Sequence, residues 1–254
     1  MILAAALLVF MPAAFAQDPP APDADEFSSL ADRILKGEAA ALEKALSLLD
    51  EGKVPSKEAL ARLVQALKTA PAPSTAPRLR AIIDRTEAPE LREEWVKVLA
   101  HLSREAGPQL LVDLINDPQD DVAKAARAGV FGQTSRSHID LFKKLLGNPD
   151  VECRLEAADA LFRLDARDGY AVVRTVLEDS KSAHRSKAIE IVRKVRRKET
   201  VDLLLPLLDA PEEPLRRESR EALLEVLDAL FPYLWFRKEA PAEKIRSWWT
   251  ANRP

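Results

Sequence analysis

The sequence contains little glycine and only one cysteine. Its 254 residues include 7 glycines, whereas charged residues make up 31% of the chain. A glycine-poor chain with many leucine, alanine and charged residues favours helices with one solvated face over sheets. The lone Cys153 cannot form an intramolecular disulfide, so packing alone must stabilise the fold. These scarcities predict an all-α protein.

Familiar catalytic and cofactor motifs are also missing. The sequence has no GxGxxG, P-loop, GxSxG, HExxH or paired CxxC, the signatures of many nucleotide-binding proteins, hydrolases and zinc sites. We expect Cys153 to be a buried, small apolar residue and His184 to be a packed, hydrogen-bonded side chain. His101 and His138 lie far from His184 in sequence. The sequence therefore predicts no catalytic residue, no metal and no other cofactor.

The net charge of −3 gives no general attraction to nucleic acid. Residues 174–198 are an exception, because they contain nine basic and three acidic side chains. A basic segment of this kind is either a solvated face or a surface that binds an anionic polymer. We expect no nucleic-acid partner, because the first residues indicate export.

The amino-terminal residues have the pattern of a signal peptide. Residues 2–11 are almost wholly apolar, and Ala14-Phe15-Ala16 has the small-x-small pattern of a cleavage site. The run is shorter than the roughly 20 apolar residues needed to cross a bilayer. We predict a signal peptide at residues 1–16, a disordered linker at 17–26, and a periplasmic or extracellular chain with no integral membrane segment after cleavage.

A repeat with a step of 31 residues follows. Similar segments begin at regular intervals, and each contains a short apolar stripe, a turn and a longer helical pattern. The turns contain short polar residues and proline, as in Asn148-Pro149-Asp150, which can cap the next helix. The five segments begin at Leu79, Leu110, Leu141, Val172 and Leu203.

Aligned positions of the second helices have consistent chemistry. One column is apolar, and we expect it to face the core: Leu99, Val130, Leu161, Val192 and Leu223. Another is mostly small, which lets neighbouring helices approach closely: Trp95, Ala126, Ala157, Ala188 and Ser219. Trp95 interrupts this column, so we expect different packing around the first repeat.

A third column is rich in arginine, at positions 92, 123, 154, 185 and 216, where only residue 123 is alanine. We expect these arginines to form a ladder that hydrogen-bonds turn carboxylates and carbonyls between repeats. This role is structural.

These features resemble the HEAT-repeat family, in particular its short bacterial form of roughly 30 residues, named after phycobilisome lyases. The resemblance covers residues 79–226 and depends on the Pro/Asp turns, the apolar-Arg pair Leu215-Arg216, and the alanine pairs Ala125-Ala126 and Ala157-Ala158. It implies a right-handed α-solenoid of stacked antiparallel helix pairs with a curved binding surface. The family also includes occasional enzymes.

Both ends depart from the repeat. We assign residues 27–78 to divergent helices, near Phe27–Lys36, Ala39–Leu49 and Lys57–Lys68, followed by a Pro-rich connector. The HEAT-like repeats occupy 79–233, and 234–254 are predicted to form an aromatic capping helix. Ile245, Trp248 and Trp249 can share one face of that helix, which would seal the last repeat or, alternatively, dock a partner.

The resemblance and the missing catalytic motifs predict a non-enzymatic scaffold that binds a protein of unknown identity; its oligomeric state is left open. A HEAT-like enzyme of the lyase or glycosylase type, or a basic-surface binder of anionic envelope polymer, are the alternatives. From the helical period, the partner-binding positions opposite the core of the second helices are expected to be Lys124, Leu155, Asp159, Arg163, Ser186, Glu190, Lys194, Arg217 and Glu221.

Overall fold

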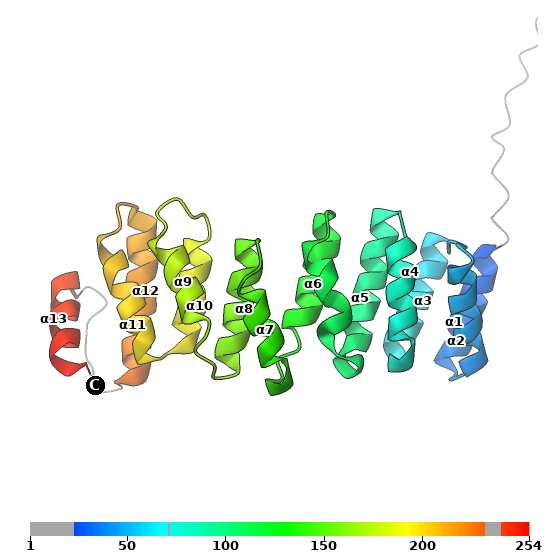
Figure 1. The fold of residues 1–254 in the computed structure, drawn as a ribbon, viewed down its shortest axis with the longest axis horizontal. Coiled ribbons are helices and arrows are strands. Elements are labelled where there is room, and N and C mark those ends of the chain that lie inside the picture. Colours follow the sequence, from blue (N-terminus) through cyan, green and yellow to red (C-terminus); the bar gives the residue numbers. More distant parts are fainter. Residues whose placement is uncertain (1–22, 71, 232–239, 254) are drawn as a thin grey trace, which may run out of the picture. The chain divides into compact units, whose positions relative to one another are not determined.

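The computed structural model describes residues 23–70, 72–231 and 240–253. Within these ranges all regular structure is helical, as predicted, and no helix is both long and apolar enough to cross a membrane. The chain divides into two compact units, residues 1–98 and 99–254, whose helices are labelled in Figure 1.

The first unit contains three helices that match the predicted amino-terminal stretches closely. α1 (Asp23–Leu35) packs against α2 (Ala39–Asp50) and α3 (Lys57–Thr69). The Ser56 hydroxyl caps α3 by accepting a hydrogen bond of 3.3 Å from the amide of Ala59. A 3₁₀ turn, η1 (Pro73–Thr75), then leads into α4 (Ala76–Arg85) and α5 (Pro89–Ala106), the latter continuing into the second unit.

The prediction of a disordered linker over residues 17–26 is wrong at its carboxyl end, because α1 begins at Asp23. Pro22 is the last proline of this stretch. Proline restricts the residue before it and lacks an amide proton, but it places no such constraint on a helix that starts after it. The predicted signal peptide and the rest of the linker lie outside the described residues.

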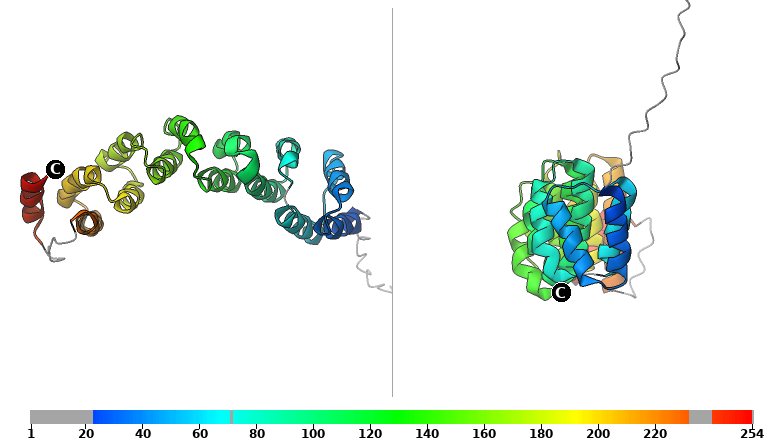
Figure 2. Two further views of the ribbon diagram at one scale, coloured as in Figure 1. Left: turned by 90° about the horizontal axis from the view of Figure 1, so that it is seen from below. Right: turned by 90° about the vertical axis from the view of Figure 1, so that its right-hand side faces the viewer.

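The second unit repeats a helix pair. The first helices of the pairs are η2 (Pro108–Asn116), α7 (Ile139–Leu145, preceded by the turn η3, Arg136–His138), α9 (Tyr170–Glu178) and α11 (Lys198–Leu204) with its extension η4 (Leu205–Asp209). The second helices are α6 (Asp120–Phe131), α8 (Val151–Arg163), α10 (Arg185–Val195) and α12 (Glu213–Leu230). The left panel of Figure 2 shows these pairs nearly end-on.

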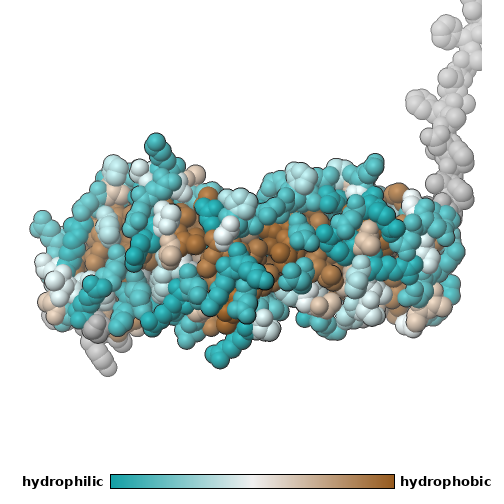
Figure 3. All heavy atoms as spheres, in the orientation of Figure 1, coloured by the Kyte–Doolittle hydropathy of each residue, from teal (hydrophilic) through white to brown (hydrophobic). Residues whose placement is uncertain are grey.

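The predicted core columns are confirmed. All ten residues of the apolar column (99, 130, 161, 192, 223) and the small column (95, 126, 157, 188, 219) are fully buried. Within each unit, neighbouring pairs therefore cover one another's apolar faces, and small side chains keep the helices close. On the face shown in Figure 3, hydrophobic residues are set between hydrophilic ones.

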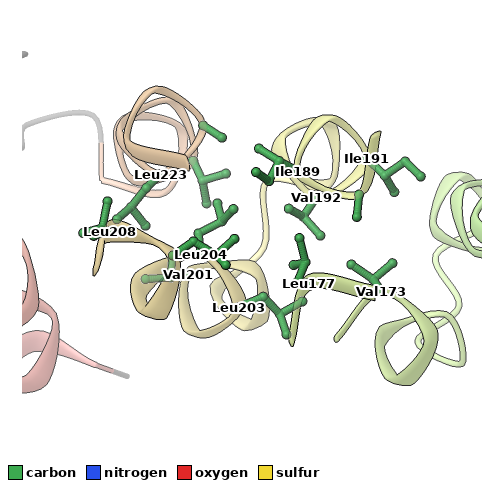
Figure 4. Packing of buried hydrophobic residues seen from close by; sticks show 14 of the residues in the cluster. Val173, Leu177, Ile189, Ile191, Val192, Val201, Leu203, Leu204, Leu208 and Leu223 are labelled. Atoms are coloured by element: carbon green, nitrogen blue, oxygen red, sulfur yellow. The ribbon is translucent and has the colours of Figure 1, made fainter. Parts of the chain in front are cut away.

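The last repeats form a continuous apolar cluster with the carboxyl-terminal helix. Figure 4 shows side chains of α9, α10, α11 and α12 pointing toward one another, among them Leu177, Val192 and Leu204. α13 (Ala242–Asn252) adds Ile245 and Trp249, both buried. The Trp249 indole donates to Asp202 Oδ1 at 3.0 Å.

The carboxyl-terminal helix thus covers the last repeat, as the capping interpretation expects. Trp248 is half-buried and packs edge-on against Phe231, with ring centroids 5.0 Å apart. Most of the aromatic segment 230–236 that precedes α13 in sequence lies outside the described residues.

The arginine column acts mainly within repeats, contrary to the predicted ladder between them. Arg154 donates to the carbonyls of Asn148 and Pro149, at 2.8 and 3.0 Å. Arg216 does the same for Ala210 and Pro211, at 2.6 and 2.8 Å. The column lies at the start of each second helix, beside the free carbonyls where the first helix ends, so an arginine reaches its own turn first.

Arg185 forms hydrogen bonds both within its own repeat and to the next repeat. Its Nε donates to Leu177 O at 3.1 Å in its own repeat, and its guanidinium reaches Glu212 Oε2 of the next repeat at 3.4 Å. Arg92 similarly donates to Ile83 O at 3.3 Å.

Close packing between repeats predicts a sharp penalty at Gly169. A Cβ built there lies 2.8 Å from Ala158 Cβ and 2.9 Å from Ala158 Cα. Because backbone must shift to admit it, we expect Gly169→Ala to lower the free energy of unfolding by about 1–3 kcal/mol, measured by urea denaturation. Gly147→Ala is the matched control, since its Cβ meets only Lys144 O at 3.5 Å. Equal unfolding midpoints for the two variants would contradict this packing.

Candidate partner-binding groove

A groove lies between α6 and α8, the second helices of consecutive repeats. Its volume is about 350 Å³. Most of its lining is charged, and Ala128 and Phe131 provide an apolar part. The lining residues are Lys124, Arg127, Ala128, Phe131, Glu152, Glu156, Asp159 and Arg163.

Arg127 is the central cation of this groove. Its side chain is only 10% exposed, and it forms a short ion pair with Asp150. Its guanidinium nitrogens also lie 3.6 Å from Glu152 Oε2 and 3.9 Å from Glu156 Oε2. Such a poorly solvated cation is tolerated because carboxylates surround it. Asp150 in turn accepts the amide of Glu152 at 3.0 Å as the amino-terminal cap of α8.

Lys187 of α10 extends the ion-pair network to the following repeat. Its Nζ lies 2.6 Å from Glu152 Oε1 and 3.3 Å from Glu156 Oε1. The hydrogen bond from Lys187 lowers the pKa of the Glu152 carboxyl, although burial opposes this. Burial also disfavours the charged form of Lys187, but the two carboxylates outweigh it and raise the pKa of the amine.

The rims of the groove carry exposed ion pairs. Lys124 pairs with Asp120 at 2.5 Å, one helical turn away on α6. Arg163 pairs with Asp159 at 3.1 Å and also donates to Phe131 O at 3.0 Å, which ties the end of α8 to the end of α6. Solvent screens the Lys124–Asp120 pair, whereas the acceptor of the Arg163 bond is the backbone carbonyl of Phe131, whose position the helix fixes.

Three of the predicted partner-binding residues, Lys124, Asp159 and Arg163, meet in this groove. The other exposed positions lie on later second helices, where Glu190 and Lys194 pair with each other at 2.7 Å. Those exposed positions are Ser186, Glu190 and Lys194 on α10, and Arg217 and Glu221 on α12.

The prediction that Leu155 faces away from the core is wrong. Leu155 is fully buried in the cluster that includes Val173 and Ile189. Position 155 borders the apolar stripe of α8, and a leucine there is long enough to be covered by the next helix pair. The residues at the same position in other repeats, Lys124, Ser186 and Arg217, remain solvated.

Arg127, Glu152, Glu156 and Lys187 were not among the predicted site residues. Arg127 occupies the column of Val96, Ala158 and Ile189, all buried apolar residues, so a charge at that position was a recognisable signal. Glu156 and Lys187 lie 31 residues apart. Opposite charges at the repeat distance indicate an ion pair between successive second helices.

Cys153 and His184, two other side chains that could react chemically, occupy structural positions. Burial raises the pKa of the Cys153 thiol to about 12, so the buried thiol stays protonated at neutral pH. His184 is half-buried at the residue before α10. Among the described residues, no group of three or more His, Cys, Asp or Glu side chains is placed to hold a metal ion.

The basic segment 174–198 is partly neutralised by neighbouring carboxylates. Arg193 lies 3.8 Å from Glu225, and Arg197 pairs closely with Asp165. Together with the Glu190–Lys194 pair, these contacts reduce the excess positive charge that the sequence alone indicates.

The repeated helix pairs agree with a family model. A model of HEAT repeats matches residues 40–130 and 139–224. The chain belongs to the HEAT-repeat family. The match begins within the amino-terminal helices, so the divergent segment that precedes Leu79 also has HEAT character. The fold is accordingly an all-α solenoid of HEAT repeats.

Among solved structures, the chain is similar to human deoxyhypusine hydroxylase in complex with glycerol. The two chains share 16% sequence identity over 88% of this HEAT-repeat chain and 93% of the hydroxylase, with a TM-score of 0.30. No curated protein matches the chain significantly.

The Glu152–Lys187 pair predicts an acid-dependent contribution to stability. The pKa of Glu152 is lower in the folded chain than its usual value. Its ionised form therefore stabilises the fold above the unfolded pKa of about 4.3, and this contribution is lost as the pH falls through the folded pKa. We expect Glu152→Gln to unfold more easily than the parent in urea at pH 7, and the difference to shrink at pH 3. A pH-independent difference would contradict this pairing.

Proposed function

We propose that this protein is a non-enzymatic scaffold that binds a protein partner in the groove between α6 and α8. The groove itself carries the proposal: it is a hollow between successive second helices, lined mostly by charged residues, with Ala128 and Phe131 as its apolar part. Interfaces commonly combine apolar and polar contacts in this way. HEAT repeats often present second-helix surfaces of this kind to other proteins.

The side chains of the groove are held in place before any partner arrives. Arg127 is fixed by carboxylates from α8, and Arg163 is fixed by Asp159 and by the carbonyl of Phe131. Binding to ordered side chains loses less conformational entropy than binding to mobile ones. The ion pairs thus favour recognition of a partner with a defined arrangement of charges.

The amino-terminal end of the groove has an excess of negative charge. Carboxylates outnumber cations among the charged residues that line this end or form ion pairs with its lining. Asp120 and Asp121, which pair with the lining residue Lys124, are strongly exposed, at 73% and 77%. A basic side chain of the partner is the complementary group at this end. The charged residues are Asp120, Asp121, Asp150, Glu152 and Glu156 against Lys124, Arg127 and Lys187.

Export is part of the same proposal and is supported by the sequence of residues 1–16. The mature chain would begin at Gln17 and act in the periplasm or outside the cell. Mass spectrometry of the native protein tests this. A mature amino terminus at Gln17 agrees with export, whereas an intact protein that retains residues 1–16 in the cytosol contradicts it.

Affinity capture tests the groove. We expect the purified mature chain to retain a specific protein from envelope extract, and Asp121→Lys to weaken that retention by roughly tenfold, because it reverses the charge of a carboxylate that pairs with the lining residue Lys124. Asp140→Lys is the matched control, since Asp140 is also an exposed aspartate in the first turn of a helix, but on the first helix α7.

The two variants lose similar helix-dipole interactions, so a difference between them reports on the groove. Equal loss of the partner in both variants would contradict binding at this site. Failure to capture any protein, or turnover of an envelope substrate by the purified chain, would contradict the scaffold.

A further inference from the structure

A second cavity lies between the first helices of two consecutive repeats, α9 and α11 with its extension η4. Its volume is about 430 Å³, within the usual range of about 300–1,000 Å³ for ligand pockets. The buried aliphatic side chains of Leu177, Leu203 and Leu207 belong to its lining. None of its lining residues belongs to the groove between α6 and α8, so the two sites are separate.

Two aspartates of this cavity are already neutralised by the carboxyl-terminal end of the chain. Asp202 accepts from the indole of Trp249 at 3.0 Å and from the guanidinium of Arg253 at 2.7 Å. Asp209 forms a close ion pair with Arg246. These two carboxylates are therefore occupied by cations and donors of the same protein.

Two other charges of the lining remain free. Arg174 and Glu178 are both exposed and both line the cavity. Within the described part of the chain, neither forms a hydrogen bond or an ion pair. They lie one helical turn apart on α9, so their side chains share one face of that helix. The third lining arginine, Arg185, is engaged by Leu177 O and Glu212.

The preceding repeat shows which counter-charge Arg174 lacks. Lys143 lies 31 residues before Arg174, and its amine pairs with Asp168 at 3.1 Å. The residue 31 positions after Asp168 is Glu199, which lies 3.4 Å from Arg167 instead. Arg174 thus has no carboxylate where the repeat supplies one to Lys143. A carboxylate on a ligand can take that place and accept charge-assisted hydrogen bonds from the guanidinium.

We propose that this cavity binds a short segment of a partner protein in which an aliphatic residue lies between a carboxylate and a basic side chain. Arg174 donates to the carboxylate, and Glu178 accepts from the basic side chain. The aliphatic side chain packs against Leu177, Leu203 and Leu207. A segment with charges of one sign only brings a like charge to Arg174 or to Glu178, which disfavours it.

Peptide titration of the purified protein, followed by nuclear magnetic resonance of its backbone amides, tests this directly. The probe is the capped peptide acetyl-Glu-Leu-Lys-amide. One control, acetyl-Glu-Gly-Lys-amide, lacks the aliphatic group, and the other, acetyl-Lys-Leu-Lys-amide, lacks the carboxylate. We expect saturable binding of the probe and about tenfold weaker binding of each control. No saturable binding of the probe, or equal dissociation constants for all three peptides, would overturn the proposal.

Reversal of one cavity charge should reverse the preference among the peptides. In Arg174→Glu both free charges are negative, so we expect about tenfold weaker binding of acetyl-Glu-Leu-Lys-amide and tighter binding of acetyl-Lys-Leu-Lys-amide. Lys144→Glu is the matched control, since Lys144 is also an exposed cation of a first helix without a partner among the described residues, but it does not line this cavity. Binding of every peptide should stay within about twofold of the parent in this control.

Glu178→Lys provides the converse test, because both free charges are then positive. We expect this variant to prefer acetyl-Glu-Leu-Glu-amide over the probe. Tighter binding of a peptide cannot result from misfolding, so the two reversals distinguish recognition from loss of structure. An unchanged order of preference in both variants, or equal effects of Arg174→Glu and Lys144→Glu, would overturn the assignment of the site.

Discussion

Each helix pair of this protein can bury its apolar face only against the neighbouring pairs. A single pair has too little core to fold alone, and Cys153 is the only cysteine, so no disulfide can substitute for packing. The full burial of Leu161 and Ala157, and of the same two positions in the other repeats, is the direct result. Stacking thus determines which positions must be apolar, which must be small, and which are left for charges.

The groove between α6 and α8 is a consequence of this stacking. Consecutive second helices lie side by side, and the space above their buried contact is bordered by whatever side chains flank the core. Here those side chains are charged, and Arg127 replaces an apolar residue at a position buried in most repeats. Asp150, Glu152 and Glu156 compensate the buried charge of Arg127, so the protein itself supplies its counter-charges.

The fold was largely predictable because its determinants recur every 31 residues. A repeated apolar column averages over local irregularities, and the helices, turns and buried positions follow from it. The partners of Arg154 and Arg216 were not predictable in this way. The arginine column is visible in the sequence, but the bonds of a flexible side chain depend on which carbonyls lie within its reach. Likewise, α1 starts at Asp23 because a proline-rich stretch limits only the residues it contains and those just before it.

The candidate site was predicted only in part, because it depends on departures from the repeat. Lys124, Asp159 and Arg163 were found from the helical period, since exposed positions of adjacent second helices border the same groove. Leu155 is buried although the helical period predicts exposure, because the period does not determine how far a neighbouring helix pair covers the edge of α8. Arg127 was overlooked because a charge in a buried column becomes meaningful only when its carboxylate partners are placed.

Site-specific crosslinking tests the central claim, that the partner sits in this groove, most directly. A photoreactive amino acid at Ala128, an exposed groove residue, is compared with one at Ala171, an exposed residue of the first helix α9. Irradiation of the native complex should give a covalent adduct with a partner protein from position 128 and little or none from position 171. An adduct from position 171 alone, or equal adducts from both, would contradict a partner bound between α6 and α8.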